Sequence, residues 1–387
     1  MNIEKITPDG RKTVLLLSWR DIKSNKSGGA EVYTHEMLKR ADHSKYRFIH
    51  ISAMFPNAKE KEEIDGVEYI RYGNPLTVIQ YAMAYYKKNR DSIDLVVDQC
   101  NTHRFFTKFW VERKKRIFFI HQLTREIWFK NASFPINIIG YITETPFLML
   151  SRKDYTMTVS ESTKQELIDI GFNPEKTFII PEGLSFKPWE KEEFKKKEKE
   201  FTAIYVGRFV NYKGIDDAVK ACCKVKKEGV NIKLWVVGRK NEKYIEEKLK
   251  PVMEEEKVSY GGAEEGKEIT FWGFVDDEKK YELMSRAHIL VFPSIREGWG
   301  LIVTEAAAVG TPSIVYNSPG TRDAVNFGSA GYLTKNNTAE ELAEILKSAA
   351  NKSDEYEYIK EKSYEYSKQF HWDTTAAEFM KFIERIK

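Results

Sequence analysis

Residues 289–312 read ILVFPSIREGWGLIVTEAAAVGTP, and this stretch decides the fold. Its first four residues, Ile289–Phe292, are apolar without alternation, which is typical of a strand buried on both faces of a parallel sheet. A loop with Glu297 and two glycines comes next. A helix is then predicted from Leu301 to Val309, and the Gly-Thr-Pro that follows ends it. The order strand, glycine-rich loop and helix predicts an α/β fold.

This loop and the start of its helix form a candidate anion site. The glycines permit close backbone approach, and the first amides of a helix, together with its dipole, favour a negative charge such as a diphosphate. We expect Glu305, one turn into the helix, to accept hydrogen bonds from a ribose, and Glu297 to reach the hydroxyls of a sugar. Either glutamate alone is more often structural, but the whole arrangement favours function. The remaining residues expected to contact the nucleotide here are Gly298, Trp299, Gly300, Leu301 and Ile302.

A second candidate loop is YVGRFVNYKG, residues 205–214. A strand is predicted to end at Val206, and Arg208 and Lys213 then flank a loop that leads into a helix at Gly214. Two cations beside a helix N-terminus suit a diphosphate, because they offset the charge of the leaving group as a glycosidic bond breaks. Taken alone, they are equally well two surface cations in a connecting loop; together with the first loop, a diphosphate clamp is the better interpretation.

Two weaker candidates lie in the first half of the chain. Paired glycines, Gly28 and Gly29, precede a predicted helix and suggest a backbone contact with a phosphate, although a simple turn explains them equally well. The segment matches neither GxxxxGK[ST] nor GxGxxG. His121 directly follows the apolar strand 117–120. At the end of such a strand it is expected to face a cleft and to hydrogen-bond the donor sugar or orient the acceptor, although a lone histidine is more often structural.

Outward from these loops, short apolar runs alternate with helical patterns through both halves of the chain. The predicted strands are Thr13–Ser18, Arg47–Ile51, Leu95–Asp98, Ile117–Ile120, Tyr155–Val159, Thr202–Val206, Lys233–Val237, Ile269–Trp272, Ile289–Phe292 and Ser313–Tyr316. The predicted helices include Ala30–Arg40, Ser162–Ile170, Gly214–Lys227, Glu242–Glu255, Asp277–Arg286 and Leu301–Val309. This order predicts two Rossmann-like, doubly wound domains facing across a cleft. The pattern pauses at residues 187–200, KPWEKEEFKKKEKE, interpreted as a solvated linker or exposed helix. The predicted domains are residues 1–186 and 187–369.

Composition bounds the remaining possibilities. With 387 residues, 42% hydrophobic and 31% charged, the chain suits a folded protein of two domains, and a net charge of +4 does not argue for nucleic acid. Its odd count of three cysteines (Cys100, Cys222 and Cys223) favours a reducing, cytoplasmic setting. The polar N-terminus lacks a signal-peptide core. Residues 134–150 are apolar but too interrupted to span a bilayer.

These motifs in this order resemble the retaining GT-B glycosyltransferases of family 4, the glycosyl transferases group 1. The stretch from Glu297 to Glu305 is similar to the E-x7-E motif of that family, and residues 207–214 are similar to its phosphate loop. Gly28–Gly29–Ala30 resembles its N-terminal glycine loop, and TVSES at residues 158–162 resembles a segment near its domain junction. Where Trp299 stands, a phenylalanine is commoner in the family.

The resemblance implies a function and a mechanism. The family transfers sugars from nucleotide-diphosphate donors with retention, usually explained by front-face attack. It needs neither a cofactor nor a divalent metal, which fits the adjacent aspartate pairs at 216–217 and 276–277, better interpreted as helix starts. A helix at about residues 370–387 would pack back on the first domain. The implied roles are diphosphate binding for Arg208 and Lys213, ribose for Glu305, sugar for Glu297 and His121, and base for the loop with Gly273 and Phe274.

The first domain is expected to select the acceptor, which is a glycan, a lipid-linked sugar or a protein. Basic and aromatic residues mix at 108–119, and 134–150 adds apolar surface, so peripheral contact with the cytoplasmic membrane face is one interpretation and a plain core strand and helix end is the other. Polysaccharide, glycolipid or glycoprotein glycan synthesis is the expected setting. Two alternatives remain open: a non-catalytic glycosyltransferase-like partner subunit, and a nucleotide-sugar epimerase on the same fold.

Overall fold

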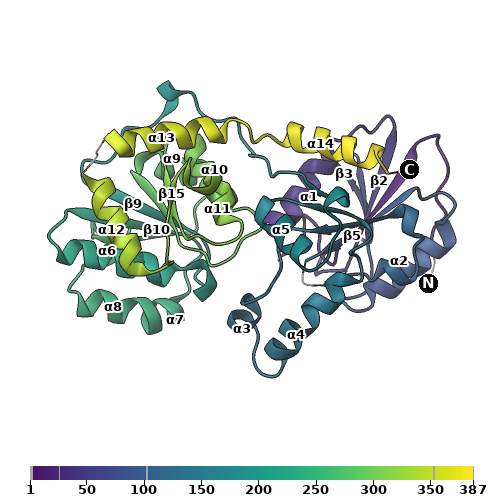
Figure 1. Ribbon diagram of the computed structural model, residues 1–387, viewed down its shortest axis with the longest axis horizontal. Coiled ribbons are helices and arrows are strands. Elements are labelled where there is room, and N and C mark those ends of the chain that lie inside the picture. Colours follow the sequence, from purple (N-terminus) through teal and green to yellow (C-terminus); the bar gives the residue numbers. More distant parts are fainter. Residues whose placement is uncertain (1–2, 26, 102, 352–353, 387) are drawn as a thin grey trace. The chain divides into compact units, whose positions relative to one another are not determined.

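A computed structural model describes residues 3–25, 27–101, 103–351 and 354–386. The chain divides into two units (Figure 1). Unit 1 consists of Met1–Gly183 with His371–Lys387, and unit 2 of Leu184–Phe370. The sequence placed the boundary after residue 186, whereas this division falls between Gly183 and Leu184.

Unit 1 contains one sheet with strand order β3-β4-β2-β1-β5-β6-β7-β8, in which only the β3–β4 pair is antiparallel. Its strands are β1 (Lys12–Leu17), β2 (Tyr46–Ser52), β3 (Lys61–Ile64), β4 (Val67–Arg71), β5 (Leu95–Cys100), β6 (Arg116–Ile120), β7 (Tyr155–Thr158) and β8 (Thr177–Ile179). Its α-helices are α1 (Gly29–Lys39), α2 (Val78–Asn89), α3 (Ile127–Asn131), α4 (Ile136–Met149), α5 (Glu161–Asp169) and α14 (Trp372–Glu384).

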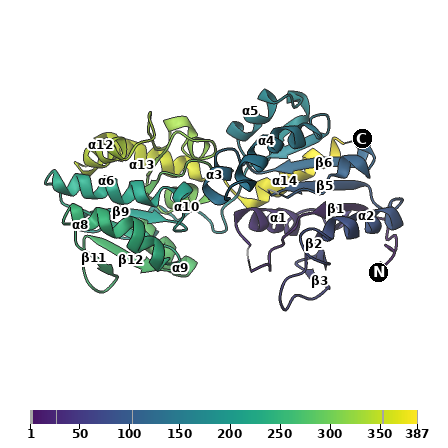
Figure 2. The same ribbon diagram turned by 90° about the horizontal axis from the view of Figure 1, so that it is seen from below.

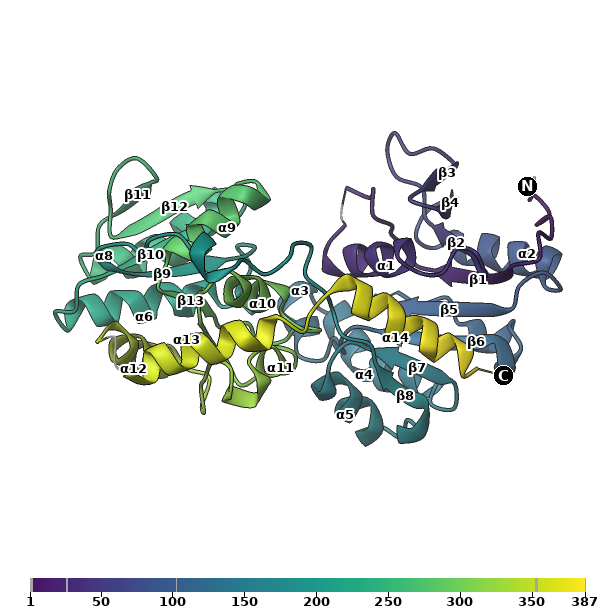
Figure 3. The same ribbon diagram turned by 90° about the horizontal axis from the view of Figure 1, so that it is seen from above.

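Helices cover both faces of this sheet, because successive side chains of a strand point to opposite faces. Phe118 of β6 packs with Leu148 of α4 and Leu167 of α5, which lie on the same side of β6 (Figure 2). Its neighbour Phe119 meets Tyr33 of α1 on the other face. Tyr33 also contacts Trp372, and α14 runs beside α1 (Figure 3). The C-terminal helix therefore belongs to the core of unit 1.

Unit 2 repeats the plan with strand order β11-β12-β10-β9-β13-β14-β15, all paired in parallel. Its strands are β9 (Phe201–Val206), β10 (Ile232–Val237), β11 (Tyr260–Gly262), β12 (Ile269–Gly273), β13 (Ile289–Phe292), β14 (Ser313–Val315) and β15 (Tyr332–Leu333). Its α-helices are α6 (Ile215–Lys227), α7 (Glu242–Tyr244), α8 (Lys250–Glu255), α9 (Asp277–Arg286), α10 (Leu301–Ala308), α11 (Thr321–Ala324), α12 (Ala339–Ala350) and α13 (Asp354–Ser367). The predicted strands and crossover helices are confirmed in both units.

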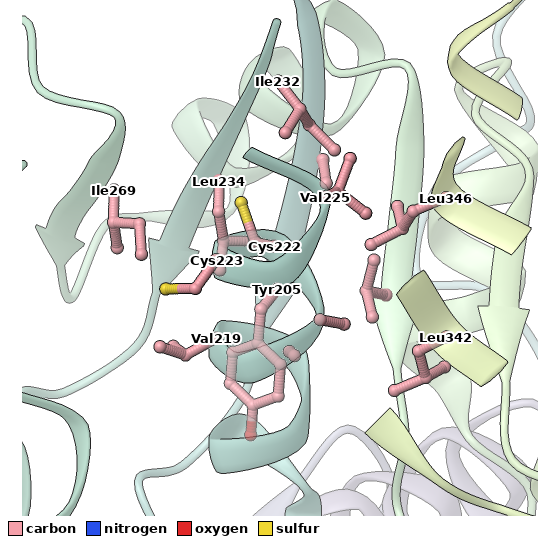
Figure 4. Packing of buried hydrophobic residues seen from close by; sticks show 14 of the residues in the cluster. Tyr205, Val219, Cys222, Cys223, Val225, Ile232, Leu234, Ile269, Leu342 and Leu346 are labelled. Carbon is pink, nitrogen blue, oxygen red and sulfur yellow. The ribbon is translucent and has the colours of Figure 1, made fainter. Parts of the chain in front are cut away.

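The core of unit 2 explains the two adjacent cysteines. Cys222 and Cys223 are fully buried on α6, which packs against β9 and β10 on one side and against Leu342 and Leu346 of α12 on another (Figure 4). Burial raises the pKa of the Cys223 thiol to about 12, so it stays protonated and acts as a small apolar group. These cysteines therefore serve packing.

One prediction about secondary structure is wrong and another is incomplete. The helix expected over Glu242–Glu255 is present over the same residues, as α7 and α8, but it contains a π-helical turn at Ile245–Leu249 between them. Pro251 is the physical reason, because it has no backbone N–H to donate to the carbonyl one turn earlier.

The charged segment 187–200 is neither a solvated linker nor an α-helix. It has only one 3-10 turn, at Lys191–Glu193, and it runs along unit 2. The backbone N–H of Trp189 donates to the carbonyl of Ala308, and Lys197 Nζ donates to the carbonyls of Ala287 and Gly310 at 2.7 and 3.0 Å. Its charges are exposed, but its backbone and Lys197 hold it on the core.

Candidate functional site

The topology of unit 2 brings several strand ends to one edge. Strands β12, β10, β9 and β13 are neighbours and parallel, so the loops that follow them lie side by side at their carboxyl ends. The backbone N–H of Gly238, after β10, donates to the carbonyl of Gly273 at 2.9 Å. A Cβ on Gly238 would lie 2.0 Å from the carbonyl oxygen of Gly207, after β9. Only glycine permits this approach, so these three loops form one continuous surface.

The two strongest sequence candidates meet at this edge. Lys213 Nζ donates to Glu297 Oε1 at 2.5 Å, and both side chains are largely buried. Lys213 comes from the loop after β9, and Glu297 comes from the loop after β13. Eighty-four positions separate them in sequence. The ammonium of Lys213 also lies 5.4 Å from the ring centre of Phe292, the last residue of β13.

Glycines make this meeting possible. Gly214 has φ +73°, and a Cβ there would lie 2.1 Å from the carbonyl oxygen of Pro293. Gly320 has φ +82°, and its Cβ would lie 2.3 Å from the carbonyl oxygen of Glu297. The backbone N–H of Glu297 donates to the carbonyl of Pro319 at 3.0 Å. The loop that carries Glu297 is thus held from both sides by backbone contacts.

Arg208 stands at the exposed side of the same loop. Its Nη2 donates to the hydroxyl of Tyr212, and its guanidinium carbon lies 5.9 Å from the centre of that ring. The hydroxyl of Tyr205 donates to the carbonyl of Arg208 at 3.0 Å and fixes the backbone. A tethered but exposed guanidinium can still reach an anionic ligand.

The start of α10 has the features of an anion-binding end. Gly300 caps the helix with φ +104°, and the first turn of α10, all of which is described, has no acidic residue. Trp299 is buried, and its Nε1 donates to Thr304 Oγ1 at 2.8 Å. Gly298, Leu301 and Ile302 are half-buried. The N-terminal amides of α10 are therefore not neutralised by a carboxylate in the first turn of the helix.

Glu305 sits deeper and has a partner that sequence reasoning missed. Its Oε2 lies 3.0 Å from Nζ of Lys280, on α9, and Lys280 also pairs with Asp277 at 2.9 Å. Burial raises the pKa of Glu305, while Lys280 acts in the opposite direction. Burial lowers the pKa of Lys280, but the neighbouring carboxylate of Glu305 raises it. The net result is a pKa of Lys280 above its ordinary value. The only signal in the sequence was a lysine on a predicted helix, which is too common to single out.

The predicted base-binding residues follow β12. Gly273 ends this strand with φ +73°, and Phe274 next to it is exposed. An exposed aromatic ring at a strand end offers a face on which a base can stack. It shares the carboxyl edge of the sheet with Arg208 and Lys213.

The glycine loop belongs to unit 1, at the start of α1. Glu31 is buried on the first turn of α1, and its Oε2 accepts the backbone N–H of Gly28 at 2.7 Å. Its other oxygen accepts hydrogen bonds from Arg20 and Asn101, each at 3.0 Å. Gly29 is exposed. This helix start therefore carries a carboxylate, unlike the start of α10.

His121 also belongs to unit 1 and is buried at the end of β6. Its Nδ1 lies 3.7 Å from Glu182 Oε1, and its Nε2 lies 3.3 Å from the side-chain nitrogen of Gln99. Tyr33 meets its ring edge-on, with ring centres 5.0 Å apart. His121 is thus surrounded by an amide, a carboxylate and an aromatic ring, which suits a histidine with a fixed orientation.

The structure thus brings most of the predicted residues together in unit 2 and leaves His121, Gly28 and Gly29 in unit 1. It adds Lys280, Glu31 and the turn at residues 318–320 that supports Glu297. The turn had one sequence signal, since Ser-Pro-Gly follows a predicted strand.

Two family models match the chain in succession. The model "Glycosyltransferase Family 4" matches residues 27–186, and the model "Glycosyl transferases group 1" matches residues 186–366. The capsular polysaccharide biosynthesis glycosyltransferase CapM of Staphylococcus aureus is 24% identical over 246 residues, 59% of this chain and 62% of that protein. The chain spans less than two thirds of the length of this and other curated relatives.

Solved structures share the fold over nearly the whole chain. Sucrose-phosphate synthase from Thermosynechococcus elongatus has a TM-score of 0.75 at 18% identity, covering 97% of this chain and 99% of that one. HepE of Anabaena in complex with UDP and glucose has a TM-score of 0.67 at 16% identity, covering 97% of this chain and all of that one. The GT-B fold class predicted from the sequence is confirmed, and the chain belongs to the group 1 glycosyltransferases of family 4.

Proposed function

We propose that the protein is a retaining glycosyltransferase of the hexosyltransferase type, which moves a sugar from a nucleotide-diphosphate sugar to an acceptor hydroxyl. The observation that carries this proposal is the pairing of Lys213 with Glu297 at the edge where α10 begins, with Arg208 on the same loop as Lys213. Two cations and a helix amide end are suited to a diphosphate, and a carboxylate beside them is suited to sugar hydroxyls.

The chemistry follows from where charge develops. As the bond between the sugar and the diphosphate breaks, negative charge grows on the leaving phosphate, and Arg208, Lys213 and the α10 dipole offset it. In the structure Glu297 already neutralises Lys213. An incoming diphosphate would take over Lys213 and release Glu297 to accept hydrogen bonds from the sugar. In this proposal, attack on the front face retains the configuration, with the departing phosphate helping to deprotonate the acceptor.

The other candidate residues would bind the remaining parts of the donor. Glu305 would accept the ribose hydroxyls, and Phe274 with Gly273 would lie against the base. His121 would hydrogen-bond the sugar from unit 1, and Gly28 and Gly29 would approach the phosphates. This assignment is supported by the position of each residue at a strand or helix end.

We include metal independence in the proposal. It is supported by the aspartate pairs that a metal would otherwise recruit. Asp276 caps α9 by accepting the backbone N–H of Lys279 at 2.8 Å. Asp217 accepts a hydrogen bond from the hydroxyl of Tyr316 at 2.9 Å. Both carboxylates thus have structural partners.

The expected setting is polysaccharide or related glycan synthesis in the cytoplasm. CapM, named for capsular polysaccharide biosynthesis, supports the first part. The complex of HepE with UDP and glucose supports a nucleotide-diphosphate sugar as donor. Three free thiols, two of them buried, suit a reducing compartment.

Thermal unfolding against a panel of nucleoside diphosphates and nucleotide sugars tests the proposal, because a ligand that binds only the native state raises the midpoint. We expect a rise with one diphosphate series, unchanged by EDTA and lost in Arg208→Ala and Lys213→Ala. Lys220→Ala is the control, since Lys220 is an exposed lysine on the following helix α6.

Glu297→Gln separates binding from transfer. Because it frees the charge of Lys213, this variant should bind the bare diphosphate at least as tightly as the wild type while losing transfer to an acceptor. A folded wild-type protein whose midpoint none of the diphosphates raises would contradict the donor site. Donor binding without transfer or hydrolysis would favour a non-catalytic partner subunit.

A further inference from the structure

Helix α4 of unit 1 presents an unusual surface. Its sequence is INIIGYITETPFLM, yet only Gly140 and Leu148 of the helix are buried. Ile139 is 57% exposed and Ile142 is 63% exposed. Phe134, just before the helix, is 78% exposed. Helices that are apolar on nearly every side normally lie inside a core or a membrane, so this surface calls for a partner.

The helix is held in place even though most of it is exposed. Trp128 of α3 packs over Gly140, where a Cβ would lie 2.4 Å from its ring, and Phe129 meets Tyr141 with ring centres 5.1 Å apart. Helices α3 and α4 follow each other in the chain between β6 and β7, and they contact each other (Figure 1). The exposed surface is therefore a fixed feature of a packed pair.

Glu144 is the only acidic residue of α4, and its carboxylate does not contribute to that surface. Glu144 accepts the backbone N–H groups of Thr124 and Arg125 through its two oxygens, at 2.5 and 2.8 Å. Arg125 in turn donates to Thr145 Oγ1 at 2.6 Å. The outward-facing part of α4 is thus apolar and carries no charge of its own.

Cations gather where α4 ends. Arg104 donates to the carbonyl of Phe147, and Phe106 meets the ring of Phe147 edge-on, so residues 104–109 adjoin this end of the helix. Arg113 donates to the carbonyl of Lys153 at 2.8 Å, four positions beyond Met149. The exposed residues of these segments are Lys108, Phe109, Arg113, Lys114, Arg152 and Lys153, together with one carboxylate, Glu112, which lies 3.4 Å from Nζ of Lys114.

We infer that unit 1 docks on an anionic membrane surface through α4, with its isoleucines in the interface and the basic cluster, defined as Lys108, Arg113, Lys114, Arg152 and Lys153, against lipid phosphates. Charge complementarity selects this occupant. A second copy of the chain would bring the same cations close to one another, whereas anionic headgroups neutralise them. Apolar residues beside Lys and Arg are the pattern of interfacial helices. This inference goes beyond the proposed function, since it does not depend on the donor site.

Flotation of the full chain with lipid vesicles, without donor or acceptor, tests the inference. We expect binding to phosphatidylcholine vesicles that contain phosphatidylglycerol, and little binding to phosphatidylcholine alone. Raising the salt to about 1 M, where the Debye length is about 3 Å, should release most of the protein. The double variant Ile139→Glu with Ile142→Glu should lower the partition coefficient roughly 100-fold.

A matched control keeps the result specific. Leu76→Glu with Met83→Glu places two carboxylates at exposed apolar positions elsewhere in unit 1, and Leu76 is 75% exposed. This control should float like the wild type. Lys114→Glu with Lys153→Glu should lose only the preference for anionic lipid. All variants should keep the wild-type unfolding midpoint, since none of these side chains is buried.

Three results would overturn the inference. They are a wild type that does not float with anionic vesicles, an α4 variant that floats as well as the wild type, and a dimer in light scattering that only the α4 variant dissociates. The last result would assign the surface to a second copy. Nucleotide-induced shifts in midpoint remain measurable in every variant, so failure of the donor site would be seen separately.

Discussion

Two glycines at helix starts, Gly214 in unit 2 and Gly28 in unit 1, look alike in the sequence but differ in the structure. Gly214 has φ +73°, and a Cβ there would collide with the carbonyl oxygen of Pro293 at 2.1 Å. Gly28 has φ −151°, which any residue adopts, and the nearest atom to its Cβ is Glu31 Oε2 at 3.8 Å. The fold requires glycine at the first position and has room for a side chain at the second.

The difference separates two reasons for a glycine. At Gly214 the absent side chain lets the loop after β9 close on the loop after β13, which places Lys213 beside Glu297. At Gly28 no contact with the described residues of unit 1 explains the absence, so the space suits a group that approaches from outside. The packing of the two loops thus requires glycine at position 214, whereas we propose that Gly28 leaves room for a ligand.

The largest effect is expected at Gly214. Gly214→Ala combines positive φ with a backbone collision and should lower the free energy of unfolding by about 3 kcal/mol. Urea unfolding measures this change. Gly229→Ala is the matched control, because Gly229 has φ +84° with nothing within 4 Å of its Cβ. Strain alone should then cost about 1 kcal/mol. Equal losses in the two variants would show that the contact with Pro293 is unimportant.

A smaller effect, of the opposite kind, is expected at Gly28. Gly28→Ala should change the free energy of unfolding by no more than about 0.5 kcal/mol. It should nevertheless slow sugar release from the donor roughly tenfold, because a methyl group displaces a closely approaching phosphate. Rates and unfolding midpoints measured on the same samples, with Ser27→Ala as control, check this. An unaltered rate in Gly28→Ala would remove the ligand explanation for this glycine.

Local signals account for what the sequence predicted well. The bounds of β13 and α9 match the prediction at every residue, because continuous apolar runs, caps and glycine stops all act within a few positions. Parallel strands also bring their carboxyl ends together, so the meeting of Lys213 and Glu297 followed from the predicted topology.

Long-range contacts account for what the sequence did not predict. Strand β3, KEEI, is polar and half-exposed, and it forms only because β4 pairs with it. The charge of residues 187–200 suggested a linker, but hydrogen bonds from its backbone and from the side chain of Lys197, to residues about 90 to 120 positions away, hold this segment on unit 2. The exposed surface of α4 depends equally on what does not pack against it, which no local pattern records.

Lys280 is a further long-range partner, and it supports the smallest of the expected effects. If ionised Glu305 accepts the ribose hydroxyls, affinity for the nucleotide is present above the pKa of Glu305 and is lost as the pH falls through it. Burial has already raised this pKa above its ordinary value, and Lys280 limits the rise. Lys280→Met should raise the pKa further, so the loss of affinity should occur at higher pH.

Calorimetric titration of the nucleoside diphosphate between pH 5 and pH 8 measures this shift, with an expected weakening of several-fold at neutral pH. Lys279→Met is the control, because Lys279 is the preceding residue and pairs with Glu282 instead of Glu305. Identical pH profiles for Lys280→Met and the wild type would show that Glu305 does not bind the nucleotide as a carboxylate. The same shift in Lys279→Met would attribute the effect to general charge. A shift that occurs only in Lys280→Met would show that Lys280, which belongs to no motif, controls the protonation of Glu305, which belongs to the E-x7-E motif.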